Sequence, residues 1–311
     1  MPDQVEPPPS SLEATYKGRE FEGVLDLYFY RRVGFWMARF FARLGMTPSG
    51  VTLLGGVFGI LAGHLYYYRD LRVNLIGMLL HICANALDNA DGQLARLTNT
   101  QSRKGRILDS VVDHLIFISI YVHLALRCLS EGASPAIWLL TAAAALSHAL
   151  QALAADYSRN AFLYFVKGRS RAYFESYDEL LDAYRQLRWS KAPIDKIVLA
   201  VNLNATRQQE LLSPGLGRLQ KTVSREFTSE IPAWWQMRYR QIVGPSFRLW
   251  GFLMTNTRML LLFAVLLLDR PAWFFWAEVT VFNLLFLVLI FQQTRMSKSL
   301  LGLAISGPET A

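Results

Sequence analysis

Six apolar stretches recur along the 311 residues of this chain, and each is long enough to cross a bilayer as a helix. A spanning helix needs about 20 apolar residues at a rise of about 1.5 Å each. The stretches lie at about 47–68, 72–95, 106–127, Ser134 to beyond Asp156, 247–268 and 271–293. They predict an all-α, polytopic membrane protein with six transmembrane helices. The fifth is the weakest, because it contains Arg258.

The N-terminal region predicts two further elements. Residues 1–16 are acidic and rich in proline, which is typical of a disordered tail. Residues 17–46 carry apolar side chains at helical spacing, with Arg32, Arg39 and Arg43 on the other side. A basic, aromatic-rich amphipathic helix of this kind lies in the plane of the membrane interface. Packing on a soluble core would require the same amphipathicity, so the pattern alone leaves that alternative open.

The basic residues predict the orientation in the membrane. One side receives the N-terminal helix, the long polar segment after the fourth stretch, the C-terminal tail, and a short turn with Arg96, Arg103, Lys104 and Arg106. The other side receives only Arg69, Arg72, Arg127 and Arg270. Because Lys and Arg concentrate in cytoplasmic loops, we expect both termini and this turn on the cytoplasmic side.

The net charge of +8 has the same interpretation. No nucleic-acid motif accompanies it, so we expect no nucleic-acid partner and contacts with anionic lipid headgroups instead. The two cysteines, Cys83 and Cys128, lie in apolar surroundings. They predict packing residues, and they indicate neither a metal site nor an oxidising compartment.

Polar sequence divides the chain into segments. Residues 47–157 hold the first four transmembrane helices, and residues 247–311 hold the last two with a tail. Between them, residues 158–246 combine helical periodicity with the breaker "SPGLG" and the pair Trp234 and Trp235 beside basic residues. We interpret 158–246 as a helical cytoplasmic insertion.

Four aspartates lie inside the second and third stretches, where an uncompensated carboxylate costs several kcal/mol. The pattern is Asp88-x2-Asp91-Gly92-x2-Ala95-Arg96-x8-Gly105-x3-Asp109-x3-Asp113. Residues three or four apart share one face of a helix, so each stretch presents a carboxylate stripe near its cytoplasmic end. The polar turn between the stretches makes the two helices antiparallel neighbours. We therefore expect the aspartates to converge.

Divalent cations resolve the repulsion among such carboxylates. Ligands that are all oxygen favour hard ions such as Mg²⁺ or Mn²⁺, and two such ions together are the usual device for phosphoryl transfer. Glycines at 92 and 105 permit close approach of a ligand, and Arg96 suits a phosphate. A cation pathway lined by aspartates would also explain carboxylates within a membrane, so a transporter stays open as an alternative.

At these residues the sequence resembles the CDP-alcohol phosphotransferase family of integral membrane enzymes, and every position of that family's motif is filled. The stretch "MTPSGVTLLGG" looks like the family's Thr-Pro-Asn-x-x-Thr opening of the first span, with Ser49 where Asn is usual. The interfacial helix and the six-span layout fit as well. The 158–246 insertion is not explained by the resemblance.

The resemblance implies a reaction in which a CDP-linked donor, often CDP-diacylglycerol, gives its phosphate-bearing group to an alcohol and CMP leaves. It implies that two divalent cations, Mg²⁺ or Mn²⁺, bind Asp88, Asp91 and Asp109, and that Asp113 completes the cluster and acts as general base. It further implies a homodimer, and a CDP pocket shaped by Gly92, Ala95, Arg96 and Gly105.

The substrate pair stays open at this point. CDP-diacylglycerol with a water-soluble alcohol is preferred by analogy, and a CDP-choline or CDP-ethanolamine type of transfer to diacylglycerol is the alternative. An acceptor with its own phosphate would need an arginine near the metals, for which Arg159 and Arg258 are candidates. Snorkelling of these two arginines to lipid headgroups is the competing interpretation.

Overall fold

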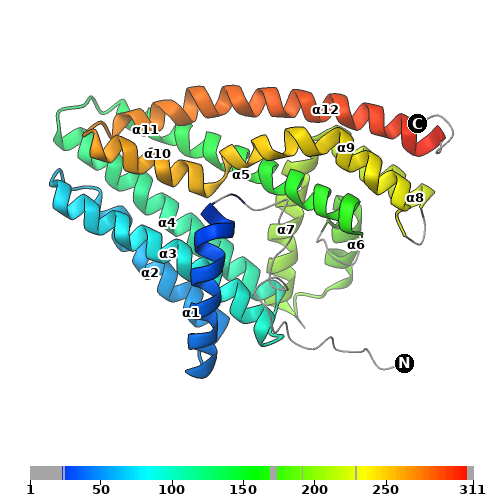
Figure 1. Cartoon of the computed structure of the whole chain (residues 1–311), viewed down its shortest axis with the longest axis horizontal. Helices are drawn as coiled ribbons and strands as arrows, with labels where there is room; N and C mark the ends of the chain where they lie inside the picture. Colours follow the sequence, from blue (N-terminus) through cyan, green and yellow to red (C-terminus); the bar gives the residue numbers. More distant parts are fainter. Residues whose placement is uncertain (1–22, 24, 169–173, 191, 228–229, 307–311) are drawn as a thin grey trace. The chain divides into compact units, whose positions relative to one another are not determined.

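In this computed structural model, the described residues are 23, 25–168, 174–190, 192–227 and 230–306. The tail predicted at residues 1–16 lies outside them. Every regular element in the described ranges is a helix, as Figure 1 shows. The α-helices are α1 (Arg31–Arg43), α2 (Pro48–Leu65), α3 (Leu71–Leu97), α4 (Arg103–Ser130), α5 (Ile137–Lys167), α6 (Tyr177–Gln186), α7 (Pro193–Leu212), α8 (Pro214–Glu226), α9 (Ala233–Trp250), α10 (Thr255–Leu267), α11 (Ala272–Ala277) and α12 (Asn283–Ser306).

Five described helical segments are long and apolar enough to span a membrane: α2, α3, α4, α5 and Ala272–Ile305. A sixth is added if Ala233–Leu253 and Thr255–Leu267 count as one span. The prediction of an all-α polytopic membrane protein is therefore confirmed. The fifth span differs in form from a plain helix, because Met254 has extended backbone angles (φ −98°, ψ 169°) that interrupt it.

The chain divides into two compact units, of which the first comprises Met1–Ala143 and Met259–Phe275. Here α2 packs against both α3 and α4. Glycines on α2 make this possible, since a Cβ at Gly56 would lie 2.7 Å from Cγ1 of Val112, and one at Gly63 would lie 2.8 Å from the backbone nitrogen of Ile120. Small residues let membrane helices approach closely and gain van der Waals contact.

Helix α1 packs on α3 in this unit, after a π-helical turn at Asp26–Tyr30. Phe35, Ala38 and Phe41 are buried, while Trp36 and Phe40 are exposed. Apolar side chains thus occupy a buried face and an exposed face, whereas the sequence predicted a single stripe. An exposed aromatic face beside arginines is the composition of an interfacial helix.

A buried arginine ties together the other end of the first unit. Arg127 is 1% exposed and donates to Asp269 at 2.7 Å, to Glu131 at 3.0 Å and to the carbonyl oxygen of Tyr66 at 3.4 Å. These partners come from the ends of α2 and α4 and from the turn after α10. The network satisfies the guanidinium and fixes that turn to the bundle.

The second unit comprises Ala144–Arg258 and Trp276–Ala311. In it α12 packs against α8 and α9, and α6 packs against α7. An aromatic cluster fills the space between α5 and α9, where the rings of Phe165 and Tyr239 lie 4.7 Å apart and those of Phe162 and Phe247 lie 4.4 Å apart. The described residues of the polar segment after the fourth span lie largely in the helices α6 to α9, and its assignment as a cytoplasmic insertion stays a prediction.

Candidate metal centre

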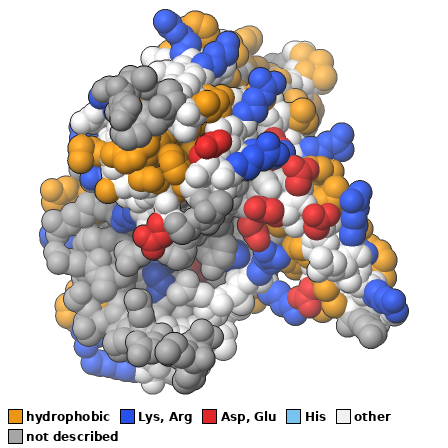
Figure 2. Space-filling view, turned by 90° about the vertical axis from the view of Figure 1, so that its right-hand side faces the viewer, with side chains coloured by type: hydrophobic (Ala, Val, Ile, Leu, Met, Phe, Trp, Pro, Cys, Tyr) orange, Lys and Arg blue, Asp and Glu red, His pale blue; other side chains and the backbone are white. Residues whose placement is uncertain are grey.

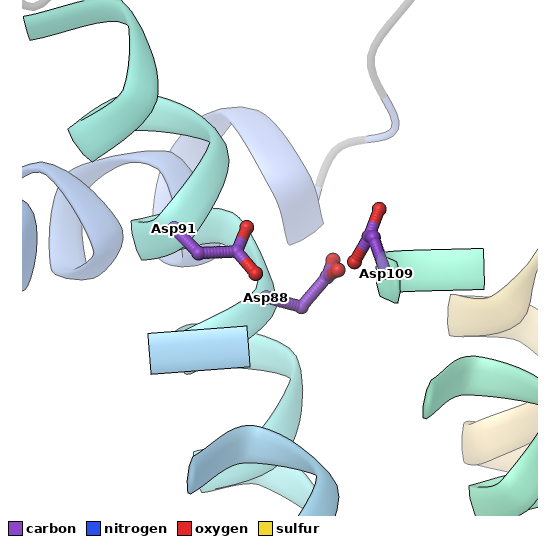
Figure 3. A group of neighbouring side chains, drawn as sticks. All are labelled: Asp88, Asp91 and Asp109. Carbon is purple, nitrogen blue, oxygen red and sulfur yellow. The ribbon is translucent and has the colours of Figure 1, made fainter. Parts of the chain in front are cut away.

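Three carboxylates from two helices converge in the first unit. One oxygen each from Asp88, Asp91 and Asp109 lies within 4.8 Å of the other two. Figure 3 shows Asp88 between the other two, with its carboxylate directed at that of Asp109. Among the described residues this is the one group of three or more acidic, histidine or cysteine side chains with such spacing.

Local sequence explains why the three meet. Asp88 and Asp91 are three residues apart on the last turns of α3, and Asp109 lies on the second turn of α4. Asn99 ends α3 with a left-handed backbone (φ 53°), a conformation that Asn tolerates well. Ser102 then caps α4 by accepting from the amide of Gly105 at 3.0 Å. The short turn brings the end of α3 to the start of α4.

Helix α2 holds the two helices that carry the site. Both α3 and α4 pack closely on α2, and their direct contact with each other is weaker. Asp91 is buried on the α2 side and accepts a hydrogen bond from the Thr52 hydroxyl, whereas Asp88 is exposed. The carboxylates therefore range from a fixed, buried group to an accessible one.

Asp113 is half-buried, one helical turn beyond Asp109 on the same face of α4. It is not one of the three carboxylates that lie within 4.8 Å of one another. The structure thus brings together three of the four predicted metal ligands, with the fourth as a neighbour along the helix.

The residues expected to shape a nucleotide pocket lie on the same ends of α3 and α4. Arg96 lies beside Gly92, where an added Cβ would be 3.7 Å from Nη2 of Arg96. Gly105 lies in the first turn of α4, and an added Cβ there would be 3.1 Å from the Ser102 hydroxyl. Ala95 is half-buried. A site for CDP at these four residues stays a prediction.

The two predicted acceptor-binding arginines belong to the second unit. Arg159 forms an ion pair with Asp156 at 2.7 Å on α5. Arg258 is 3% exposed and pairs with the fully buried Glu278 at 2.9 Å. It also bonds Gln151 and the carbonyl oxygen of Leu253. Snorkelling of Arg258 to headgroups is therefore wrong, while binding of an acceptor by either arginine stays a prediction.

The donor set limits what the centre can bind. All its side-chain donors are carboxylate oxygens, which suit hard divalent cations and not zinc. Carboxylates this close repel one another inside a membrane protein, and cations between them would offset that repulsion. The described residues thus fit a site for Mg²⁺ or Mn²⁺.

Sequence reasoning missed two supporting residues, Thr52 and Glu278, and left the role of a third, Gln93, open between binding at the site and bonding across helices. Thr52 was part of a recognised motif but was given no role. Gln93 is fully buried and donates to the carbonyl oxygen of Arg31 at 3.1 Å, which holds α1 against α3 close to Asp91. Glu278 was a detectable partner for Arg258, because it is the one acidic residue in the sixth apolar stretch.

Comparison with known proteins connects this centre to a family. Residues 45–164 match the model of the CDP-alcohol phosphatidyltransferase family, a range that includes all four aspartates. Over 85 residues the chain is 39% identical to an archaetidylinositol phosphate synthase of Pyrococcus horikoshii, covering 27% of this chain and 44% of that protein. Over 94 residues it is 35% identical to an uncharacterized protein of Aquifex aeolicus, covering 29% and 46%. The matches thus span slightly under half of each relative.

Proposed function

Because residues 45–164 match the model of the CDP-alcohol phosphatidyltransferase family, we propose that this chain belongs to that family and is a transferase of phospholipid synthesis. It moves a phosphate-linked group from a CDP-activated donor to an alcohol acceptor and releases CMP. The observation that carries the proposal is the convergence of Asp88, Asp91 and Asp109 within 4.8 Å.

In this proposal Asp88, Asp91 and Asp109 hold two divalent cations, Mg²⁺ or Mn²⁺, and Asp113 completes the cluster beside them. Such ions neutralise a pyrophosphate, orient it for in-line attack and stabilise the leaving group. The accessible Asp88 faces the incoming donor, and the buried Asp91, fixed by Thr52, keeps its position as ligands exchange. Gly92, Ala95, Arg96 and Gly105 surround the CDP group, with Arg96 facing phosphate.

Asp113 acts as general base. Its position outside the tight group of three supports this role, because a carboxylate in close contact with metal is a poor proton acceptor. The acceptor hydroxyl transfers its proton to Asp113 as its oxygen bonds to phosphorus, and the bond from phosphorus to the CMP oxygen breaks.

We propose CDP-diacylglycerol as donor and a water-soluble, anionic alcohol as acceptor. The name of the Pyrococcus relative supports a phosphorylated polyol such as inositol phosphate. The basic residues Arg103, Lys104 and Arg106 at the start of α4 suit such an acceptor. We further propose that the active site and both termini are cytoplasmic, from the distribution of basic residues, and that the protein is a homodimer like others of its family.

The test is CMP release by the purified protein in detergent with Mg²⁺ or Mn²⁺. CDP-diacylglycerol is offered with glycerol 3-phosphate, serine, inositol, inositol phosphate or phosphatidylglycerol. CDP-choline or CDP-ethanolamine with diacylglycerol forms the second arm. Metal-dependent CMP from one pair, lost on chelation, identifies the reaction and the acceptor. Cation flux through liposomes without any nucleotide, and no CMP from any pair, would favour a transporter instead.

A further inference from the structure

An exposed apolar stripe runs along the first half of α7, in the part of the chain beyond the family match. Ile194, Ile197 and Val201 are 60%, 53% and 52% exposed. At about 100° per residue these three lie within about 60° of one another around the helix. Just before α7, Trp189 is 54% exposed. A cluster of this kind on a polar segment marks a surface that is covered in the working protein.

The stripe is not simply the core face of a poorly packed helix. Helix α7 has a separate buried face with Val198, Leu199 and Thr206. Lys196 of α7 donates to the carbonyl oxygen of Leu187 at 2.7 Å and lies over the rings of Tyr184 and Trp189. These contacts join Trp189 to the helix that carries the stripe.

The contact between α7 and α5 indicates the depth of α7 relative to the membrane. Gln209, near the end of α7, donates to the carbonyl oxygen of Leu153 at 3.4 Å. From Ile137 to Ala155 α5 carries no charged residue, and its first ion pair joins Asp156 and Arg159. The contact therefore lies one turn inside the first charges of a spanning helix, which is the level of the bilayer boundary.

The direction of α7 agrees with this level. Within the second unit α7 runs across the direction of the spanning helix α12, as Figure 1 shows. Helix α8, which follows α7, contacts α12 where the apolar part of α12 ends. A Cβ at Gly215 of α8 would lie 3.1 Å from Cβ of Ser297. Ser297 comes two residues after Arg295, the first basic residue of α12. A helix attached at the boundary and crossing the spans lies along the membrane surface.

The charge around the stripe identifies the surface it fits. Residues 182–210 contain five basic residues and three acidic residues. Of the basic residues, Arg185, Arg188 and Arg207 are exposed. Figure 2 shows one face of the molecule, on which basic, acidic and hydrophobic side chains are interspersed. Basic residues beside an apolar helix face, with tryptophan at its edge, favour an anionic bilayer surface.

We propose that α7 is an in-plane membrane helix that inserts Ile194, Ile197 and Val201 into the acyl boundary of an anionic leaflet. Trp189, Arg185 and Arg188 lie among the headgroups, whereas Arg207 is on another side of α7. This role is additional to phosphotransfer and does not depend on it.

The test measures the depth of single spin labels on the full chain in nanodiscs. In a Cys83→Ala, Cys128→Ala background, labels are placed at Ile197→Cys and Val201→Cys on the stripe. Arg207→Cys is the matched control, because it is exposed on another side of the same helix. With phosphatidylglycerol present, oxygen should reach the two stripe labels several-fold better than a water-soluble nickel complex does. The Arg207 label should show the reverse preference, and discs of phosphatidylcholine alone should weaken the contrast.

Equal access of the nickel complex to all three labels in anionic discs would overturn the proposal. A second result would also overturn it: in lipid-free detergent, the stripe labels become shielded from the nickel complex only at protein concentrations at which the protein associates. A second copy of the chain would then cover the stripe. Two stripe positions guard against a local effect of one label. None of these readouts involves CMP release, so failure here is distinct from failure of the proposed enzymatic function.

Discussion

The hydroxyl of Thr52 on α2 donates a hydrogen bond to the buried carboxylate of Asp91 on α3. The same hydroxyl oxygen lies 3.1 Å from the carbonyl oxygen of Pro48. A hydroxyl has one hydrogen, so Thr52 can serve only one of these two acceptors at a time. The start of α2 thereby helps to orient the most buried of the three carboxylates.

Removing this hydrogen bond should weaken metal binding. Thr52→Val keeps the shape of the side chain but leaves Asp91 without its donor, so we expect Mn²⁺ affinity to fall about 10- to 100-fold. Calorimetric or electron paramagnetic resonance titration of Mn²⁺ measures this. Thr52→Ser keeps the donor and should bind Mn²⁺ almost as wild type does. An unchanged affinity in Thr52→Val would mean that the hydrogen bond does not orient a ligand.

Replacing the proposed base should separate chemistry from binding. Asp113→Asn should lower CMP release by about 10²- to 10⁴-fold, the usual contribution of a general base, while Mn²⁺ binding largely persists. Asp182→Asn is the control, because that carboxylate is 71% exposed and far along the chain on α6. Turnover by Asp113→Asn at the control rate would show that Asp113 is not the base.

Replacing one partner of the Arg258–Glu278 ion pair should destabilise the protein more than replacing both partners. Both side chains are buried, at 3% and 0% exposure. Arg258→Met alone leaves a buried carboxylate uncompensated and should destabilise the protein by about 3–5 kcal/mol. Adding Glu278→Leu removes that charge and should recover most of the loss. The free energy of unfolding of each variant is measured in mixed micelles with an increasing fraction of denaturing detergent. An equal loss of stability in the single and double variants would contradict this account.

The stability contributed by Asp269 should depend on pH. Hydrogen bonding to Arg69 lowers the pKa of Asp269 below its usual value, with a further contribution from Arg127. Because the pKa is lower in the folded protein, the ion pairs stabilise it above about pH 4, the unfolded value, and this stabilisation is lost as pH falls through the folded value. Asp269→Asn should therefore unfold more readily than wild type at neutral pH. The difference should shrink as the pH falls below the unfolded value of about 4 and through the lowered pKa of the folded protein. A difference that stays constant across this range would exclude the ion pairs as its cause.

Long apolar stretches were enough to predict most of the fold, because a bilayer requires continuous helices of nearly fixed length. The spans predicted at 72–95 and 106–127 correspond to α3 and α4 within a few residues. The interruption at Met254 was not predictable. At this interruption the guanidinium of Arg258 bonds the carbonyl oxygen of Leu253, a contact that is visible only in three dimensions. Apolar periodicity also could not show that α1 has two apolar faces.

The candidate centre was predictable to the extent that helical spacing determines it. Steps of three and four placed Asp88 with Asp91 and Asp109 with Asp113, and the short turn brought the two pairs together. Spacing could not show how close each carboxylate comes to the others. That depends on how α2 supports α3 and α4, and so on the glycines that set the approach of α2 to α4.

The glycine face of α2 has a consequence for how this helix tolerates sequence change. Gly56, Gly59 and Gly63 lie where an added side chain would meet α4, whereas Leu53, Val57 and Ile60 are exposed. Tolerance to substitution along α2 should therefore follow the helical period: high at the exposed positions and very low at the glycines. A survival screen of random α2 variants would then reveal which side of the helix meets lipid.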